Sequence, residues 1–282
     1  MKKIGLVLEG GSFRGIFTAG VLDCWMEQGI TFPYVTGVSA GAGNALNYIA
    51  GQQGRTQKVI LHENAEPYYG LGQMRKSGKL LDLDRMVYDY SYSQIPFDFH
   101  AFFASDTECE LVVANCQSGQ AEYLSADGSE DRLLMIAKAT CSIPLMCSPV
   151  TIDGHDYMDG STIDSVPFAH ALSQCDRVVV ILTRPVGEVP TDYSKMRALL
   201  NICYGSKYPK LVDAMVNRYD VYAKQMEALD GYVREGRAFV IRPDLPSIRH
   251  FENDAEKINY YYDHGRRQAE IQLESLHRFM EQ

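Results

Sequence analysis

Two short segments near the N-terminus carry residue types that suit nucleophilic chemistry. The first, GVSAG at residues 37–41, has the form G-x-S-x-G, with Ser39 between Gly37 and Gly41. It ends an apolar, strand-like run and precedes a helix-like segment rich in small residues, the context in which such a serine occupies a tight strand-to-helix turn. The helix N-terminus would favour developing negative charge there. This context favours a nucleophile over a serine in an ordinary turn.

The second segment is EGGSFRG at residues 9–15, which directly follows the apolar run 4–8. Two chemistries use such a glycine-rich loop: binding of a dinucleotide pyrophosphate at a helix N-terminus, and stabilisation of an oxyanion by backbone N–H groups. The dinucleotide pattern G-x-G-x-x-G would need glycine where Ser12 stands. The acidic ribose partner expected about 20 residues on is also missing from residues 29–35. The loop therefore favours acyl chemistry.

The elements around these segments indicate a parallel α/β sheet. Strand-like runs at 4–8 and 34–38 alternate with helix-like segments at 16–28 and 40–51, the pattern of crossover connections. If the two strands are neighbours, their carboxyl ends bring the glycine-rich loop next to Ser39. An ordinary α/β-hydrolase carries its serine turn after several strands and pairs the serine with histidine. Here the turn follows only the second strand.

The remainder of the chain predicts further strands and a mostly helical C-terminal part. Residues 55–105 are irregular and aromatic, which indicates helices and loops laid over the sheet. The expected later elements are a hairpin at 109–116 and 120–124, a helix at 129–139, a strand pair near 150–160, strands at 177–183 and 238–243, and a helix at 254–280. In 212–233 an apolar stripe at helical spacing predicts a buried face, formed by Val212, Met215, Tyr219, Tyr222, Met226, Leu229 and Val233.

Composition excludes several classes of function. The formal charge is −9 and no cluster of Lys and Arg is present, which argues against a nucleic-acid groove or a polybasic contact with anionic lipids. The seven cysteines form no C-x-x-C pair, so neither a zinc site nor a disulfide framework is indicated, and a cytoplasmic location fits best. No apolar stretch reaches the ~18 residues of a spanning helix. Membrane contact is therefore expected to be peripheral.

A third segment, ATCSIPLMCSPVTIDGHDYMDGST at 139–162, ends in the dipeptide of Asp159 and Gly160. Asp-Gly by itself is a common turn. The three segments taken together, however, resemble the patatin-like phospholipase family, which carries a glycine-rich oxyanion loop on its first strand, G-x-S-x-G on the second and a later D-G-G or D-G-A. The resemblance covers about residues 4–184. Two residues depart from the family pattern: Ser12 replaces a third glycine, and Ser161 replaces the Gly or Ala after D-G.

The resemblance implies a three-layer α/β/α fold with a mainly parallel sheet, and a Ser-Asp dyad without a catalytic histidine. In that reading Ser39 is the nucleophile and Asp159 is its base. The oxyanion loop would be shaped, or its hydrogen bonds donated, by Gly10, Gly11, Ser12 and Phe13. Arg14 would anchor this loop, with a purely structural ion pair as the alternative. The remaining motif positions are Gly15, Gly37, Gly41 and Gly160.

The function implied is a serine acyl hydrolase acting on lipid-like carboxylic esters, of phospholipase A or carboxylesterase type, with no metal or cofactor. We expect a single domain over 1–282, with a catalytic core at about 4–184 and a mostly helical part at about 192–282. Two alternatives remain at this stage: an acyltransferase with the same nucleophile, and a non-catalytic acyl-lipid binding protein. The seven histidines show no partner motif, so none is assigned a role.

Overall fold

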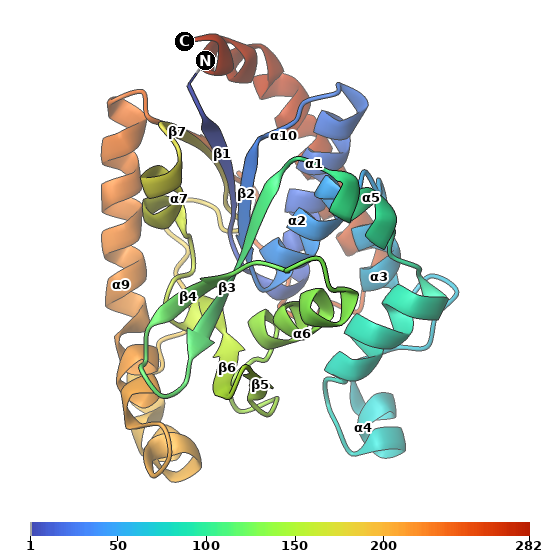
Figure 1. Cartoon of the computed structure of the whole chain (residues 1–282), viewed down its shortest axis with the longest axis vertical. Helices are drawn as coiled ribbons and strands as arrows, with labels where there is room; N and C mark the ends of the chain where they lie inside the picture. The colour runs from blue at the N-terminus through green and yellow to red at the C-terminus, as the bar shows by residue number, and fades with distance from the viewer. Residues whose placement is uncertain (1) are drawn as a thin grey trace.

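One twisted sheet with helices on both faces forms the frame of the molecule (Figure 1). The computed structural model describes residues 2–282. The strands are β1 (Ile4–Leu8), β2 (Tyr34–Val38), β3 (Glu108–Asn115), β4 (Ala121–Leu124), β5 (Val150–Ile152), β6 (His155–Asp159), β7 (Arg177–Ile181) and β8 (Ala238–Ile241). They follow the order β5-β6-β3-β2-β1-β7-β8, and β4 pairs with β3. The pairs β1–β2, β1–β7, β2–β3 and β7–β8 are parallel, and those around β4, β5 and β6 are antiparallel.

The helices vary widely in length. The α-helices are α1 (Gly15–Glu27), α2 (Ala40–Ile49), α3 (Arg55–Leu61), α4 (Leu71–Ser77), α5 (Phe99–Ala104), α6 (Glu130–Thr140), α7 (Phe168–Gln174), α8 (Arg197–Leu200), α9 (Pro209–Arg234) and α10 (Ala255–Glu281). Two segments, η2 (Arg85–Gln94) and η5 (Asn201–Gly205), are π-helical. Single 3₁₀ turns are η1 (Ser12–Arg14), η3 (Gly160–Thr162) and η4 (Ser194–Met196).

The alternation of side chains along β1 divides the core into two layers. Leu6 and Leu8 pack in the core beneath α1, α2 and α10, whereas Val7 packs on the opposite face with residues of α7 and α9. Figure 1 shows α9 and α7 on one side of the sheet and α1 and α2 on the other. This is the three-layer α/β/α arrangement expected from the resemblance.

The buried face of α9 differs from the stripe predicted for it. Tyr219 and Val233 are 41% and 42% exposed. The buried positions of this helix include Leu211 and a charged residue, Arg218, instead. The spacing of apolar residues alone does not predict a buried arginine on the core-facing side of a helix.

Candidate active site

Ser39 and Asp159 meet because two strands end head to head against β3. Val38, the last residue of β2, pairs with Val112, and Asp159, the last residue of β6, pairs with Val113. Since β4 already pairs with both of these β3 residues, β2 and β6 must share the other edge of β3. One strand runs parallel and the other antiparallel to β3, so their carboxyl ends converge. The Ser39 Oγ donates a hydrogen bond to Asp159 Oδ2 at 2.8 Å.

The serine occupies a strained turn between β2 and α2. Ser39 has φ 55° and ψ −122°, a conformation that costs a residue with a side chain on the order of 1 kcal/mol or more. The flanking glycines allow the tight passage. A Cβ on Gly37 would lie 2.5 Å from the carbonyl oxygen of Gly41, and a Cβ on Gly41 would lie 2.3 Å from that of Leu8. The G-x-S-x-G pattern therefore reflects backbone packing around a buried nucleophile candidate.

Thr140, at the end of α6, holds this turn in place. Its Oγ1 accepts a hydrogen bond from the Ser39 amide at 2.8 Å and donates one to the Val112 carbonyl at 2.6 Å. Both bonds are buried, so neither polar backbone group has water as an alternative partner. Sequence reasoning assigned Thr140 no role, although it lies in the third segment, two residues before the S-I-P residues at 142–144.

Asp159 is buried and held by hydrogen bonds. Its Oδ1 accepts from the Ser161 amide at 2.8 Å, while Oδ2 faces Ser39. Burial raises the pKa of Asp159 above its usual value, and hydrogen bonds from Ser161 and Ser39 offset part of that rise. Gly160 packs against β3, where a Cβ would lie 2.3 Å from the Val112 carbonyl oxygen. No histidine among residues 2–282 hydrogen-bonds to either member of the pair.

The glycine-rich loop approaches the serine from β1. A Cβ on Gly10 would lie 3.3 Å from the Ser39 Cβ, which places the two segments in contact. Within the described chain the amides of Gly10, Gly11 and Ser12 donate to no protein acceptor. The Phe13 amide differs, since it donates to the His250 carbonyl at 3.1 Å. The Phe13 amide is thus already paired, whereas the three preceding amides keep their hydrogen-bonding capacity.

Buried charges fix the loop to the strand beside it. Glu9 forms a buried ion pair with Arg184, and its other carboxylate oxygen accepts from the Thr183 amide at 2.5 Å. Arg14 donates from Nε to the Gly11 carbonyl at 3.3 Å and from Nη1 to Glu188 at 2.8 Å. Arg14 therefore contacts both the backbone of the loop and a carboxylate outside it. Neither Glu9 nor Arg184 was singled out, because only the pairing of β1 with β7 brings them together.

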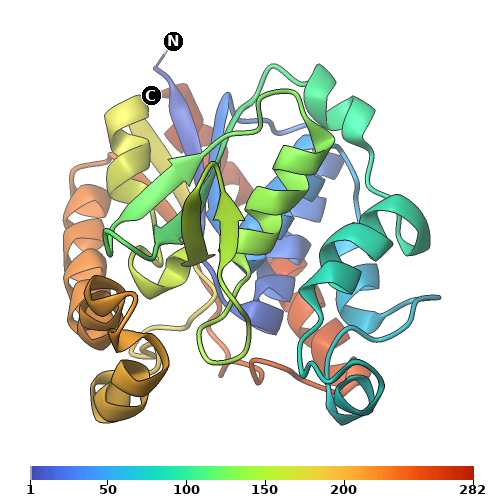
Figure 2. The same cartoon turned by 60° about the horizontal axis from the view of Figure 1, so that its bottom comes forward.

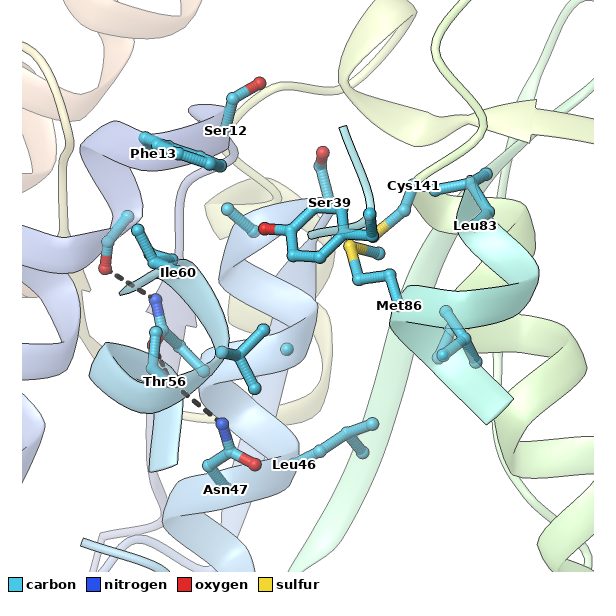
Figure 3. A pocket seen from close by; sticks show the side chains of 18 of the residues that line it. Ser12, Phe13, Ser39, Leu46, Asn47, Thr56, Ile60, Leu83, Met86 and Cys141 are labelled. Atoms are coloured by element: carbon cyan, nitrogen blue, oxygen red, sulfur yellow. Dashed lines mark hydrogen bonds between the residues drawn. The ribbon is translucent and has the colours of Figure 1, made fainter. Parts of the chain in front are cut away.

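A cavity of about 160 Å³ extends from Ser39 into the helical layer. Figure 3 shows Ser39 at one end near Phe13, with Asn47 and Thr56 at the other end. The wall between them is mostly apolar and includes Leu46, Ile60, Leu81, Leu83, Met86 and Cys141. At the inner end, Asn47 Nδ2 donates to Thr56 Oγ1 at 2.8 Å, and Arg55 donates to Asn47 Oδ1 at 2.9 Å. The cavity is thus an apolar tunnel with a polar floor.

Comparisons with known proteins agree with the fold and with the family resemblance. The family model described as patatin-like phospholipase matches residues 6–172, and a second one, a domain of unknown function, matches residues 208–281. The chain is 32% identical over 261 residues to the uncharacterized protein YjjU of Escherichia coli, covering 86% of this chain and 69% of that protein. It is 27% identical over 183 residues to the lysophospholipase nte1 of Emericella nidulans, covering 60% of this chain and 11% of that much longer protein.

A solved structure has the same fold at low sequence identity. The crystal structure of VipD from Legionella pneumophila superposes with a TM-score of 0.50 at 14% identity, covering 98% of this chain and 67% of that one. In the part of the chain that the structure describes, no helix combines the length and apolar character needed to cross a membrane. The motifs, the sheet that assembles them and the match over residues 6–172 together show that this chain belongs to the patatin-like phospholipase family.

Proposed function

We propose that the protein is a lipid acyl hydrolase that cleaves carboxylic esters with a Ser39–Asp159 dyad. The observation that carries the proposal is the 2.8 Å hydrogen bond from Ser39 Oγ to Asp159 Oδ2 at one end of an apolar cavity. A hydroxyl needs an adjacent base to become a nucleophile, and this carboxylate lies within hydrogen-bond reach. Membership of a phospholipase family and similarity to a lysophospholipase support a lipid substrate.

The reaction has two half-steps. Ser39 Oγ attacks the ester carbonyl carbon while Asp159 takes its proton, and the carbonyl oxygen becomes an oxyanion that the amides of Gly10, Gly11 and Ser12 are free to receive. Collapse breaks the bond to the alcohol oxygen, which leaves with the proton from Asp159. Water then loses a proton to Asp159 and attacks the acyl-enzyme. The products are the free acid and the regenerated Ser39 hydroxyl.

The cavity supports an acyl chain as the group that enters. Its walls are apolar, so each methylene removed from water contributes about 0.8 kcal/mol to binding. Its floor at Asn47, Thr56 and Arg55 offers hydrogen-bonding groups that already satisfy one another. An alkyl chain forms no hydrogen bonds that could replace those it would break there. These residues therefore limit how far the acyl chain enters the cavity. We therefore propose that the acyl chain lies in this cavity and that the alcohol part of the ester lies on the other side of Ser39.

The segment around α4 supports peripheral contact with a lipid surface. Its base lines the cavity through Tyr68 and Leu81, while Leu71 and Met74 are 71% and 51% exposed. The exposed cation Arg75 lies beside them. Figure 2 shows α4 projecting from the body of the molecule at the edge that comes forward. A tip with exposed apolar side chains, joined to the cavity wall, suits partial insertion into a bilayer surface.

A cytoplasmic location is part of the same proposal. All seven cysteines are free, and Cys24, Cys116 and Cys175 are buried. Burial raises the pKa of Cys175 to about 11 and of Cys116 to about 12, so these thiols stay protonated and inert. A protein without cross-links that carries so many thiols suits a reducing compartment.

The decisive experiment uses purified Ser39→Ala with the exposed-serine variant Ser206→Ala as a control. Wild type and control should react with a fluorophosphonate probe and hydrolyse p-nitrophenyl and phospholipid esters, whereas Ser39→Ala should do neither. All three proteins should still unfold in one cooperative thermal transition, because one hydroxyl is removed without loss of core volume. Probe labelling with no turnover in any ester would instead favour acyl transfer to another acceptor. Absence of labelling in the wild type would contradict the proposal.

A further inference from the structure

The C-terminal segment 208–281, which matches a domain of unknown function, reaches into the proposed catalytic site at two points. The His250 carbonyl accepts the Phe13 amide of the glycine-rich loop at 3.1 Å. The second contact comes from α9, where Arg218 Nη2 lies 3.4 Å from the hydroxyl oxygen of Ser161. Ser161 is the residue that stands where the family pattern has Gly or Ala. The Ser161 side chain, which the family pattern lacks, is therefore contacted by Arg218, which lies outside the residues 6–172 that match the family model.

Arg218 is an unusual residue to bury. It is 9% exposed, and its guanidinium lies 5.8 Å from the centre of the Tyr193 ring. In the described part of the chain its Nε has no hydrogen-bond partner. A buried guanidinium without a direct carboxylate partner costs free energy unless a nearby anion offsets its charge.

That anion is Asp159. Arg218 faces the carboxylate through Ser161, whose amide donates to Asp159 Oδ1 at 2.8 Å while its hydroxyl receives Arg218. Burial has the largest effect on the pKa of Asp159 and raises it. Hydrogen bonds from Ser161 and Ser39 lower this pKa, and the charge of Arg218 lowers it by a smaller amount. A relay of contacts therefore runs from Arg218 through Ser161 to Asp159, and from there to the Ser39 hydroxyl.

The other groups around this relay are neutral or paired. Facing Asp159 are Cys141, Cys147 and Tyr193, and burial raises the pKa of each, so all three are uncharged at neutral pH. On the Arg218 side, Glu9 and Arg184 form an ion pair with each other. His250 is neutral too, since burial and the charges of the nearby arginines lower its pKa to about 4. Among residues 2–282, Arg218 and Asp159 are therefore the charged groups of this site without an ion-pair partner.

We propose that Arg218 is a positioning residue of the active site, which acts through Ser161 to orient the Asp159 carboxylate and to keep it ionised as the base. Segment 208–281 would then contribute to catalysis, because its helix α9 supplies a positive charge that does not come from residues 6–172, the part that matches the family model. The inference rests on the proposed dyad, since it assigns Arg218 an effect only through Asp159.

The test is the pH dependence of kcat/KM on a soluble p-nitrophenyl ester for the full chain. The variants are Arg218→Met, Arg218→Lys and Ser161→Ala, with Arg234→Met as a control that removes an exposed arginine from the same helix. Arg218→Met removes a charge that favours ionised Asp159, so the acid limb should move to higher pH. The expected shift is about 0.5 to 1 unit, below the 1 to 3 units of directly adjoining charges. At pH values below the acid limb, this shift lowers kcat/KM about three- to tenfold.

Each variant separates a charge effect from a packing effect. Arg218→Lys keeps the cation and should keep the acid limb within about 0.3 unit of wild type. Ser161→Ala keeps the amide bond to Asp159 but removes the hydroxyl, whose effect on the Asp159 pKa exceeds that of the Arg218 charge, so it should shift the limb in the same direction by at least as much. Arg234→Met should match wild type. Ser161→Ala and Arg218→Lys also keep the proposal testable if Arg218→Met does not fold.

Two results overturn the inference. One is an Arg218→Met profile that superposes on wild type, and the other is an equal loss of activity at every pH in both the Met and Lys variants, which marks a structural role. Failure of the dyad itself is visible separately. If Ser39→Ala or Asp159→Asn kept wild-type turnover, the proposed function would fail whatever the Arg218 profile shows.

Discussion

The Ser39 hydroxyl donates a hydrogen bond to the Asp159 carboxylate at 2.8 Å, although 120 residues separate the two in the chain. The contact exists because β2 and β6 end opposite consecutive residues of β3, Val112 and Val113. Thr140 adds a third connection at the same place by bonding both the Ser39 amide and the Val112 carbonyl. The geometry of the proposed dyad is therefore set by the strand pairing along β3, and changes in its supports should affect activity before they unfold the protein.

Replacing Thr140 by Val should separate support from chemistry. Valine has nearly the same shape but leaves the buried Ser39 amide and Val112 carbonyl without a partner, which should cost about 1 to 3 kcal/mol in the free energy of unfolding. Because the serine turn loses its fixed position, kcat should also fall about 10- to 100-fold. Thr140→Ser keeps the hydroxyl and serves as the control in denaturant unfolding and ester hydrolysis. Equal behaviour of the two variants would remove Thr140 from the list of supports.

Replacing Gly11 by Val tests the glycine-rich loop. The Cβ of the new side chain would lie only 2.6 Å from the Thr183 hydroxyl oxygen, which is closer than van der Waals contact allows. The loop must shift, and its free amides move with it. Removal of one oxyanion donor costs about 100- to 1000-fold in kcat, and we expect a loss of this size with KM changed far less. A loss below about tenfold would mean that the amides act elsewhere.

Much of this architecture follows from local patterns in the sequence. The runs at β1 and β2 and the helices after them were predicted within one or two residues, because the apolar strand cores and the small-residue turns are local signals. The convergence of β2 and β6 has no such signal. It arises from pairings along β3, and only the resemblance to a family linked Asp159 with Ser39 before the fold was known.

The supports of the site were harder to predict for the same reason. Glu9 and Arg184 lie 175 residues apart and form an ion pair only because β1 lies beside β7. Arg218 was missed because an apolar stripe was used to assign the buried face of α9, whereas the structure buries this charge and exposes Tyr219. Polar residues that serve a site break the periodicity from which a buried helix face is recognised.

Replacing Asp159 by Asn distinguishes a dyad from a triad. The amide is isosteric but cannot take the Ser39 proton, so kcat should fall by about 100- to 10,000-fold, the usual contribution of a general base. Each of the seven histidines, changed singly to Gln, should retain most activity. A single His→Gln variant that folds and is as inactive as Ser39→Ala would establish a triad instead.

The pH profile gives the same distinction by another route. Asp159 must be ionised to act as a base, and burial raises its pKa, so activity should fall as the pH decreases through a value above the usual ~3.9 of an aspartate. His62 and His250 cannot produce a limb near pH 6.5, because burial lowers the pKa of each to about 4. In Asp159→Asn the residual activity should lose this acid limb, as measured by kcat/KM between pH 4 and 9.

The tip of α4 should govern activity at a lipid surface. In Leu71→Ser/Met74→Ser two exposed apolar side chains become polar, and sedimentation with vesicles of phosphatidylcholine and phosphatidylglycerol should show binding weakened about tenfold or more. Hydrolysis of a soluble ester should stay unchanged, since neither residue lines the cavity. Ile271→Ser is the control, because Ile271 is 68% exposed on α10. If the control loses vesicle binding to the same extent, the tip of α4 is not the contact.

Filling the tunnel should shorten the acyl chain that the enzyme accepts. Gly43 lies on α2 and lines the cavity, and a Cβ there would meet no atom within 4 Å, so Gly43→Leu extends into the space where the chain would lie. The helix tolerates the change, because leucine is the better helix former. Each methylene that the leucine excludes should cost about 0.8 kcal/mol, roughly fourfold in kcat/KM.

Activity of Gly43→Leu on octanoyl and decanoyl p-nitrophenyl esters should therefore fall more than about tenfold, while activity on the acetyl ester stays within about threefold of wild type. Gly72→Leu is the matched control, since a Cβ at Gly72 on α4 also meets no atom within 4 Å but lies outside the cavity. It should leave the whole chain-length profile unchanged. A loss that is equal for acetyl and decanoyl esters in Gly43→Leu would mean that the leucine disturbs Ser39, four residues away, and that the acyl chain lies elsewhere.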